Sequence, residues 1–343
     1  MAYFSASNLL AGQAKFLDSF KKGEWRSPDV AALHVAERGE IANPSLKGLR
    51  TREDRSVYAY MPIRQAAIGS TARAHDHTGA RGDSAQTAIS WSIIAEPFSI
   101  SLKQADNNIY SFAEEYASSA QNAINNIAAR LDTAFVAWLV ANKTGYNAGG
   151  GNGSFNAVSD VYENPLAELN YFYQNMNSMM GVNLYDNPIT GIIDNKGATL
   201  ADRLKASGAT NAVNYGFQFD GMTLYPTTRT VLGSSYSGSG IFWQNGLAAV
   251  IPWIPLQNRV PFNFAQGIDS IGTFGSISVP GIPFPIAVHM YAARADNTTK
   301  NGQTQDVTLE VEFSIDTGFA AAPLSTFRGS DDEVLYAVGQ LAT

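Results

Sequence analysis

The chain has 343 residues, of which 45% are apolar and only 15% are charged, whereas a typical soluble domain is about 25% charged. Its 18 Phe, 15 Tyr and 5 Trp exclude an intrinsically disordered protein. The absence of cysteine excludes thiolate metal sites, iron–sulfur clusters and cysteine nucleophiles. The length predicts two domains or one elaborate domain, and the low charge suggests that other protein covers much of the surface.

The net charge is −7, but it is unevenly distributed. Residues 1–105 contain 13 basic and 10 acidic residues, and the remainder contains 10 basic and 20 acidic residues. An acidic chain is a poor sequence-independent binder of nucleic acid. The asymmetry reflects either chance or complementarity between the N-terminal third of one copy and the acidic body of another. Since we find neither a signal peptide nor an apolar run of about 18 residues, we expect a soluble chain made in a cytoplasm.

Residues 1–55 have the character of an arm. Their first part predicts a short amphipathic helix, because apolar residues recur at spacings of three and four: Leu10, Ala14 and Leu17, with Phe16 and Phe20 beside them. The remainder is polar and interrupted by proline and glycine, so we expect it to build no core of its own.

Residues 56–69 and 86–102 predict the two strands of a long hairpin, joined by the polar loop 70–85. Pro62 and Pro97 restrict these strands to edge or bulged positions. The hairpin would have about 13 residues a side and a length of ~40 Å. Because an isolated two-stranded hairpin is marginal in water, it packs either on its own domain or across a neighbouring subunit. The second strand alternates apolar residues with serine: Ile89, Trp91 and Ile93, then Phe98, Ile100 and Leu102.

The strongest pattern predicts one long amphipathic helix over residues 111–142. Ser111 and Glu114 form a potential capping box at its start, and Gly145 a stop at its end. About 31 residues give a rod of ~47 Å, which would span the protein or form the core helix of a globular enzyme. The apolar stripe is Phe112, Tyr116, Ala120, Ala123, Ile127, Leu131, Ala134 and Trp138, and the outer face includes Glu114, Glu115, Gln121, Asn126, Arg130 and Asp132.

The rest of the chain mixes helices and strands, with more strands near the end. We predict helices over 166–180 and 198–205, strands over 189–193, 284–291 and 307–315, a strand pair around Asp220-Gly221, and loops over 233–240 and 296–305.

Residues capable of chemistry are scattered. His75 and His77 could bind a metal with Asp83, but we favour a solvated loop tip, because no third ligand other than Asp83 is nearby. His289 lies in an apolar strand and is expected in the core. Glu310 and Glu312 share one strand face, which suits a glycosidase pair or an exposed sheet. Phosphate-binding and triad motifs are absent from the sequence, so we predict no enzyme, catalytic residue, cofactor or metal.

The order of the elements resembles the major capsid protein of tailed bacteriophages, which has the HK97-type α+β fold. The resemblance covers nearly the whole chain and is most specific in Ser111–Asn142 and Asn214–Thr230. It depends on architecture rather than on a signature motif. It implies an N-terminal arm (1–55), an extended β-hairpin or E-loop (56–105), a peripheral domain with the spine helix (106–180 and 285–343) and an axial domain (181–284).

The resemblance also implies a structural protein that self-assembles into the icosahedral capsid of a virion in the host cytoplasm. The implied partners are other copies in pentamers and hexamers, a separate scaffolding protein, a portal, decoration proteins, and packaged double-stranded DNA without sequence-specific contact; no membrane is involved. Some family members link an E-loop lysine to a neighbour's asparagine. Here no lysine lies between Lys47 and Lys103, so that bond cannot form at the hairpin tip.

We expect contacts between subunits to involve Arg64, Arg73, Arg81 and Trp91. The arginines would face acidic residues of a neighbouring copy. Two other functions stay open. The first is an encapsulin-like nanocompartment shell of the same fold, and the second is an extracellular β-rich binding protein or carbohydrate-active enzyme.

Overall fold

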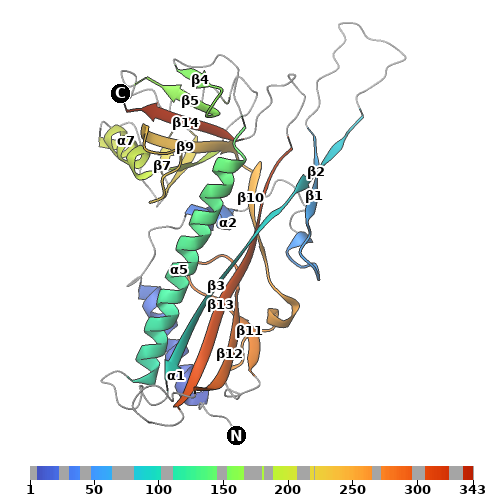
Figure 1. Ribbon diagram of the computed structural model, residues 1–343, viewed down its shortest axis with the longest axis vertical. Helices are drawn as coiled ribbons and strands as arrows, with labels where there is room; N and C mark the ends of the chain where they lie inside the picture. Colours follow the sequence, from blue (N-terminus) through green and yellow to red (C-terminus); the bar gives the residue numbers. More distant parts are fainter. Residues whose placement is uncertain are drawn as a thin grey trace. The chain divides into compact units, whose positions relative to one another are not determined.

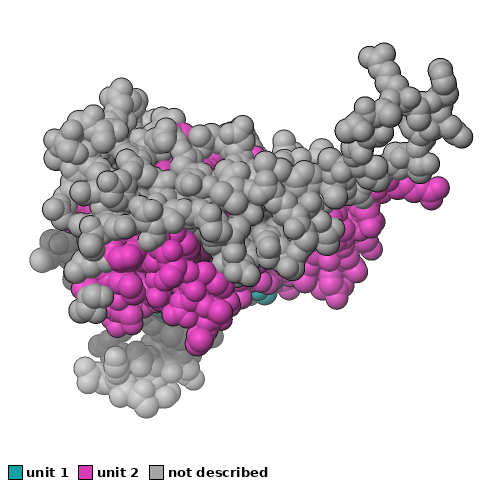
Figure 2. Space-filling model, turned by 90° about the horizontal axis from the view of Figure 1, so that it is seen from above, with its two compact units in different colours: residues 1–28, 91–131, 252–317 teal, residues 29–90, 132–251, 318–343 magenta. Residues whose placement is uncertain are grey.

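The computed structural model has the predicted α+β composition and consists of two compact units (Figure 1; Figure 2). Unit 1 comprises Met1–Pro28, Trp91–Leu131 and Pro252–Thr317, and unit 2 comprises Asp29–Ser90, Asp132–Ile251 and Gly318–Thr343. The structure describes residues 6–22, 31–38, 48–63, 81–101, 111–144, 153–165, 180, 188–206, 217–219, 221–264, 272–295, 306–323 and 335–342. Residues 70–80 of the predicted loop 70–85, the predicted loop 296–305 and most of the predicted helix 166–180 lie outside these residues. The end of the loop 70–85 is wrong, because β2 begins at Ser84.

Unit 1 is built on antiparallel strands. β11 (Thr273–Ile277) pairs with β12 (Ile286–Ala295), β12 pairs with β13 (Asp306–Ala321), and β3 (Ser90–Ser101) also pairs with β13. The predicted alternation in β13 is confirmed, since Leu309, Val311, Phe313 and Ile315 are buried. The short 3₁₀ helix η2 (Leu256–Asn258) is held to this sheet by Asn258, whose Nδ2 donates to the carbonyl oxygens of Gly275 (2.8 Å) and Val288 (2.9 Å).

The predicted N-terminal helix is confirmed as α1 (Ala6–Lys22), but its buried face differs from the prediction. Leu9, Phe16 and Phe20 are buried, whereas Leu10 is 48% exposed. The reason is the strong aromatic cluster of unit 1: the ring centroids of Phe16 and Phe20 lie 5.1 Å apart, and that of Phe313 lies 6.4 Å from Phe16. The helix is rotated so that the phenylalanines, rather than the smaller predicted stripe, face the core.

Helix α5 (Phe112–Ala141) confirms the long predicted helix, with 30 residues and a length of ~45 Å. The capping box is also present, because the Ser111 N–H donates to Glu114 Oε2 at 3.0 Å. Two residues expected on the outer face, Gln121 and Asp132, are buried. The Asp132 carboxylate is hydrogen-bonded within unit 2: Oδ1 accepts from the Ala32 N–H at 3.0 Å, and Oδ2 accepts from the Thr227 hydroxyl.

Unit 2 contains a seven-stranded sheet in the order β4–β5–β14–β9–β6–β8–β7. Helix α7 (Asn195–Ala206) contacts β9, β6 and β8, and a buried cluster that includes Ile189, Leu224 and Phe242 forms its core. The strand at 189–193, the helix at 198–205 and the strand pair around Gly221 are confirmed. The strands are β4 (Ser154–Asn156), β5 (Val161–Asn164), β14 (Tyr336–Leu341), β9 (Tyr236–Gln244), β6 (Ile189–Ile193), β8 (Met222–Pro226) and β7 (Phe217–Phe219).

The predicted loop 233–240 is wrong, because β9 begins at Tyr236 and is a central strand between β14 and β6. Its glycines fit this position by their small size. A Cβ atom at Gly240 would lie 2.9 Å from Phe242 Cε2 and 3.0 Å from the Ile192 carbonyl oxygen, which is closer than normal contact. The run of Gly and Ser therefore allows tight strand packing rather than a loop.

One helix and one hairpin of unit 2 differ from what the sequence predicts for the arm and the hairpin. Helix α2 (Ala31–Arg38) was not predicted. Its residues are mostly buried, and its His34 ring stacks on that of Tyr225 with the ring centroids 5.4 Å apart. Strand β10 (Ala248–Trp253) pairs with β13. Among the described residues, the hairpin ladder joins β1 (Tyr58–Pro62) to β2 (Ser84–Ala88) over five pairs. Residues 90–101 of the predicted second strand form β3, which pairs with β13 and does not extend this ladder. Residues 64–69 of the predicted first strand lie outside the described residues.

Candidate assembly surfaces

The β1–β2 hairpin has one buried and one exposed face. Ala59 and Met61 are buried, whereas the alternate residues Tyr58 and Tyr60 are 50% and 64% exposed. The register places Tyr58 opposite Ala88 and Tyr60 opposite Gln86, and both of these partners are exposed as well. Because successive side chains of a strand point to opposite faces, the outer face of the hairpin is a flat surface that presents two tyrosine rings.

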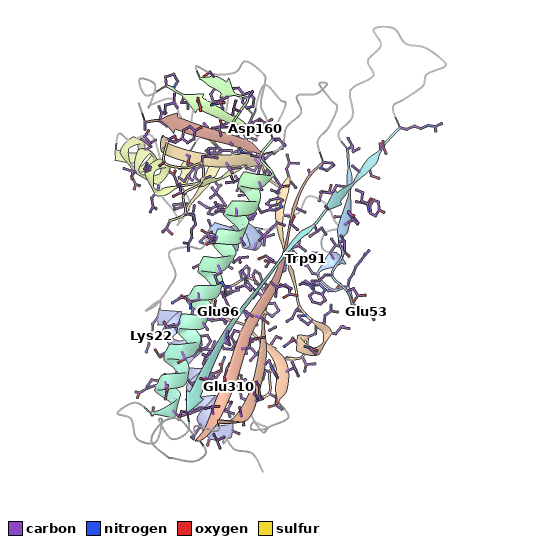
Figure 3. All side chains as sticks on the ribbon, in the orientation of Figure 1. Lys22, Glu53, Trp91, Glu96, Asp160 and Glu310 are labelled. Carbon is purple, nitrogen blue, oxygen red and sulfur yellow. The ribbon has the colours of Figure 1, made fainter. Side chains whose placement is uncertain are left out.

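The structure describes two of the four predicted contact residues, Arg81 and Trp91. Arg81 is exposed and lies just before β2 of unit 2, outside the strand itself. Trp91 is half-buried near the start of β3 in unit 1 (Figure 3). Arg64 and Arg73 lie outside the described residues. The predicted phase of β3 is wrong at Ile93, which is 60% exposed, while the adjacent Ile94 is buried. Pairing with β13 sets this phase.

A second surface is the outer face of the unit 1 sheet, where His289 lies between two aromatic rings. Its ring centroid is 4.2 Å from that of Phe274 and 5.3 Å from that of Tyr291. His289 is half-buried and was wrongly predicted in the core, because its strand alternates and His289 faces outward with Tyr291. The register places Glu312 opposite His289 and Glu310 opposite Tyr291. The face is thus aromatic and acidic, and Glu310 and Glu312 lie on an outward sheet face.

Two half-buried charged side chains each combine an enclosed polar atom that makes no hydrogen bond with a pKa that burial shifts. Within the described residues, Arg50 Nε and Glu115 Oε2 are enclosed by protein and make no hydrogen bond. Burial raises the pKa of the Glu115 carboxyl and lowers the pKa of the Arg50 guanidinium. Other charged groups do form ion pairs: Lys15 Nζ lies 2.6 Å from Glu114 Oε1, and Arg130 Nη1 lies 2.5 Å from Glu96 Oε1.

The sequence did not identify Arg50 and Glu115. Glu115 was placed on the solvent face of the long helix, and Arg50 lies in a polar stretch that has no hydrophobic period. A local pattern cannot show enclosure by residues distant in sequence. The only available signal is the uneven charge, with a basic N-terminal third and an acidic remainder.

The described residues offer little for catalysis. They contain no group of three His, Cys, Asp or Glu side chains arranged to hold a metal ion, and His75 and His77 lie outside them. The fully buried Tyr116 hydroxyl is a poor acid, since burial raises its pKa, and it donates to Gln13 Oε1 at 3.3 Å. None of the helices that the structure describes has the length and apolarity of a membrane span.

No family model matches the chain, and no curated protein matches it. Several solved structures are similar. One, from Mycobacterium phage Che8, has a TM-score of 0.44 and 8% identity, with 88% of this chain and 90% of that chain covered. The capsid of Ralstonia phage GP4 has a TM-score of 0.43 and 10% identity, covering 84% and 85%. The capsid of a native GTA particle has a TM-score of 0.44 and 11% identity, covering 87% and 90%.

Proposed function

We propose that this chain is a structural protein whose copies assemble into a closed shell. The observation that carries the proposal is the β1–β2 hairpin. It forms a two-stranded sheet of its own, whereas the other strands that the structure describes belong to sheets of five and seven strands. One face of the hairpin packs within the subunit through Ala59 and Met61, whereas the other face, with Tyr58 and Tyr60, is exposed and is available to a neighbouring copy.

The physical arrangement required is a contact between different surfaces of identical copies. Contacts of this kind close into rings when the rotation between copies is suitable, and rings of five and six copies can build an icosahedral shell. The outer face of the unit 1 sheet supports the proposal because it is aromatic and acidic. The segment before the hairpin contributes Arg52 and Arg55 together with Glu53 and Asp54, and Arg81 lies two residues from Asp83, so pairing with this acidic face would depend on individual arginines rather than on a basic surface.

The more specific proposal is the major capsid protein of a tailed bacteriophage. On this assignment residues 1–55 are the arm, 56–105 the E-loop, 106–180 and 285–343 the peripheral domain, and 181–284 the axial domain. The shell would assemble in the host cytoplasm with a scaffolding protein and a portal. The acidic body of the chain supports a role around DNA that must slide during packaging rather than adhere.

The test is to express the chain and examine it by sedimentation and negative-stain electron microscopy. We expect closed particles, and their nucleic-acid content separates a genome shell from a nanocompartment that holds protein cargo. The double variant Tyr58→Ser/Tyr60→Ser should lower the assembled fraction about tenfold, as expected when aromatic anchors of an interface are lost. Val158→Ser removes a residue that is 96% exposed in the β4–β5 turn and serves as the control.

A chain that stays a stable monomer at every concentration would refute the shell. If the tyrosine and Val158 variants assemble equally well, the proposed shell stands, but the hairpin does not contribute to the contacts between copies.

A further inference from the structure

Arg50 and Glu115 carry opposite charges, and each is partly buried by its own subunit, which disfavours the charged form of the group. Glu115 lies in the first turn of α5, and Arg50 lies directly after the short helical segment at Gly48–Leu49. Each is half-buried, with one polar side-chain atom enclosed and lacking a hydrogen bond among the described residues. Native proteins leave few buried polar groups unsatisfied, and each exception calls for an explanation.

Burial explains the shift in the pKa of each group. It raises the pKa of Glu115 and lowers the pKa of Arg50, and desolvation is the cause in both cases. A nearby group of opposite charge within the subunit would shift each pKa the other way, as Lys15 does when it lowers the pKa of Glu114. The subunit therefore holds one acid and one base in environments that a partner of opposite charge would stabilise.

We infer that Arg50 of one copy forms an ion pair with Glu115 of a neighbouring copy when the subunits assemble. The inference rests on the proposed shell and names one of its contacts. Glu115 is the one carboxylate among the described residues with an enclosed, unbonded oxygen. Other acids, such as Glu312, are exposed and keep their hydration, so they gain less from a partner.

The uneven charge of the chain supports the same pairing. Arg50 belongs to the basic N-terminal third and Glu115 to the acidic remainder. A contact that joins the front of one copy to the body of the next uses two different surfaces, and it can therefore be repeated around a ring. Assembly would pair the accessible part of each charged group, and the attraction would offset the desolvation cost that each free subunit carries.

The test is a charge exchange. Arg50→Glu and Glu115→Arg each place like charges together and should lower the assembled fraction at least about tenfold. The double variant Arg50→Glu/Glu115→Arg should return to within about threefold of wild type, because the pair is re-formed with reversed polarity. The matched control Arg52→Glu/Glu115→Arg has the same net charge but reverses an exposed arginine two residues away, and it should stay defective.

Mixing the two single variants provides a second test that does not require the double variant to fold. Copies with two acids can alternate with copies with two bases, so every contact in a ring of six is matched, whereas a ring of five keeps one mismatched contact. The assembled fraction of the mixture should therefore rise above that of either single variant. If thermal unfolding shows that a single variant is not folded, the neutral variants Arg50→Gln and Glu115→Gln replace the charge-reversed ones. Their effects on assembly should be non-additive.

Additive effects, rescue by the Arg52 control, or no recovery on mixing would overturn the pair while the wild-type shell still stands. Failure of the wild type itself to assemble would instead refute the proposed function.

Discussion

Helix α5 and the β1–β2 hairpin differ in how far their side chains are buried and hydrogen-bonded within the chain. α5 has its first turn capped by Ser111 and Glu114, its apolar residues are largely buried, and the carboxylate of Asp132 is hydrogen-bonded within the chain. The hairpin exposes both tyrosines of its outer face and has no third strand among the described residues.

The difference separates what holds the subunit together from what the subunit offers to others. Segments whose partners lie in the same chain should determine the free energy of unfolding. A segment whose outer face is exposed should contribute little to unfolding and much to assembly. Each region can therefore be assigned to one class by measuring the two properties on the same variant.

The largest expected effect concerns α1, which the sequence placed in an arm but whose Phe16 is fully buried against Phe20 and Phe313. Phe16→Ala should lower the free energy of unfolding by about 4 kcal/mol, because a large cavity replaces the ring. Urea unfolding of the disassembled subunit measures this. Leu10→Ala, on the exposed side of the same helix, should change it by less than about 0.5 kcal/mol. Similar losses of unfolding free energy for both variants would mean that α1 depends on neighbouring copies for its stability.

The next effect concerns Asp132, which tests whether α5 is held by more than its apolar stripe. Asp132→Ala removes the acceptor of the Ala32 N–H and of the Thr227 hydroxyl and should cost about 3 kcal/mol of unfolding free energy, since hydrogen bonds to charged groups are strong. Asn126→Ala, on the exposed face of the same helix, is the control. Hydrogen exchange of α2 should accelerate in the Asp132 variant alone, and unchanged exchange there would contradict its role in holding α2.

The sequence predicted α5 well because its period of 3.6 extends over thirty residues. The same method misplaced Gln121 and Asp132, since it assigns polar residues to the outside. In the case of Asp132, it cannot show that Ala32 of α2 and Thr227 donate hydrogen bonds to the carboxylate. Helix α2 was missed because eight residues contain too few turns for a reliable period. In β9 the run of Gly and Ser resembled a loop, and only the neighbouring Phe242 and Ile192 show why small residues are needed.

The candidate surfaces were harder to predict than the elements. Tyr58 and Tyr60 lie in a strand that the sequence located correctly, but which face of the strand is buried depends on the protein that covers Ala59 and Met61. No local pattern encodes that choice of face. Arg50 and Glu115 were missed for the same reason, because enclosure depends on residues distant in sequence.

The hairpin tyrosines should have a small effect on the subunit. Tyr58→Ser/Tyr60→Ser should change the unfolding free energy by no more than about 0.5 kcal/mol, because both rings are already largely in water. Met61→Ala, on the buried face of the same strand, should cost more than the two tyrosine substitutions together. A large loss from the tyrosine variant would place the hairpin in the same class as α5.

The smallest effect is the pH dependence carried by Glu115, and its sign distinguishes folding from assembly. In the separate subunit, burial raises the pKa of Glu115 above its unfolded value. Its contribution to stability is therefore present at low pH and is lost as the pH rises through the folded-state pKa. In the assembled shell, pairing with Arg50 would lower this pKa below that of the free subunit. Assembly would then be favoured above the free-subunit pKa and weakened as the pH falls through the assembled-state pKa.

Unfolding and disassembly of wild type and Glu115→Gln, measured between about pH 3 and pH 7, separate the two linkages, because this range spans the ordinary titration of glutamate. Glu115→Gln should remove one increment of pH dependence from each process, with opposite signs. Increments of the same sign would mean that Glu115 stays unpaired in the shell and that its burial serves only the subunit. That outcome would transfer Glu115 from the surfaces that join copies to the interior that holds one copy together.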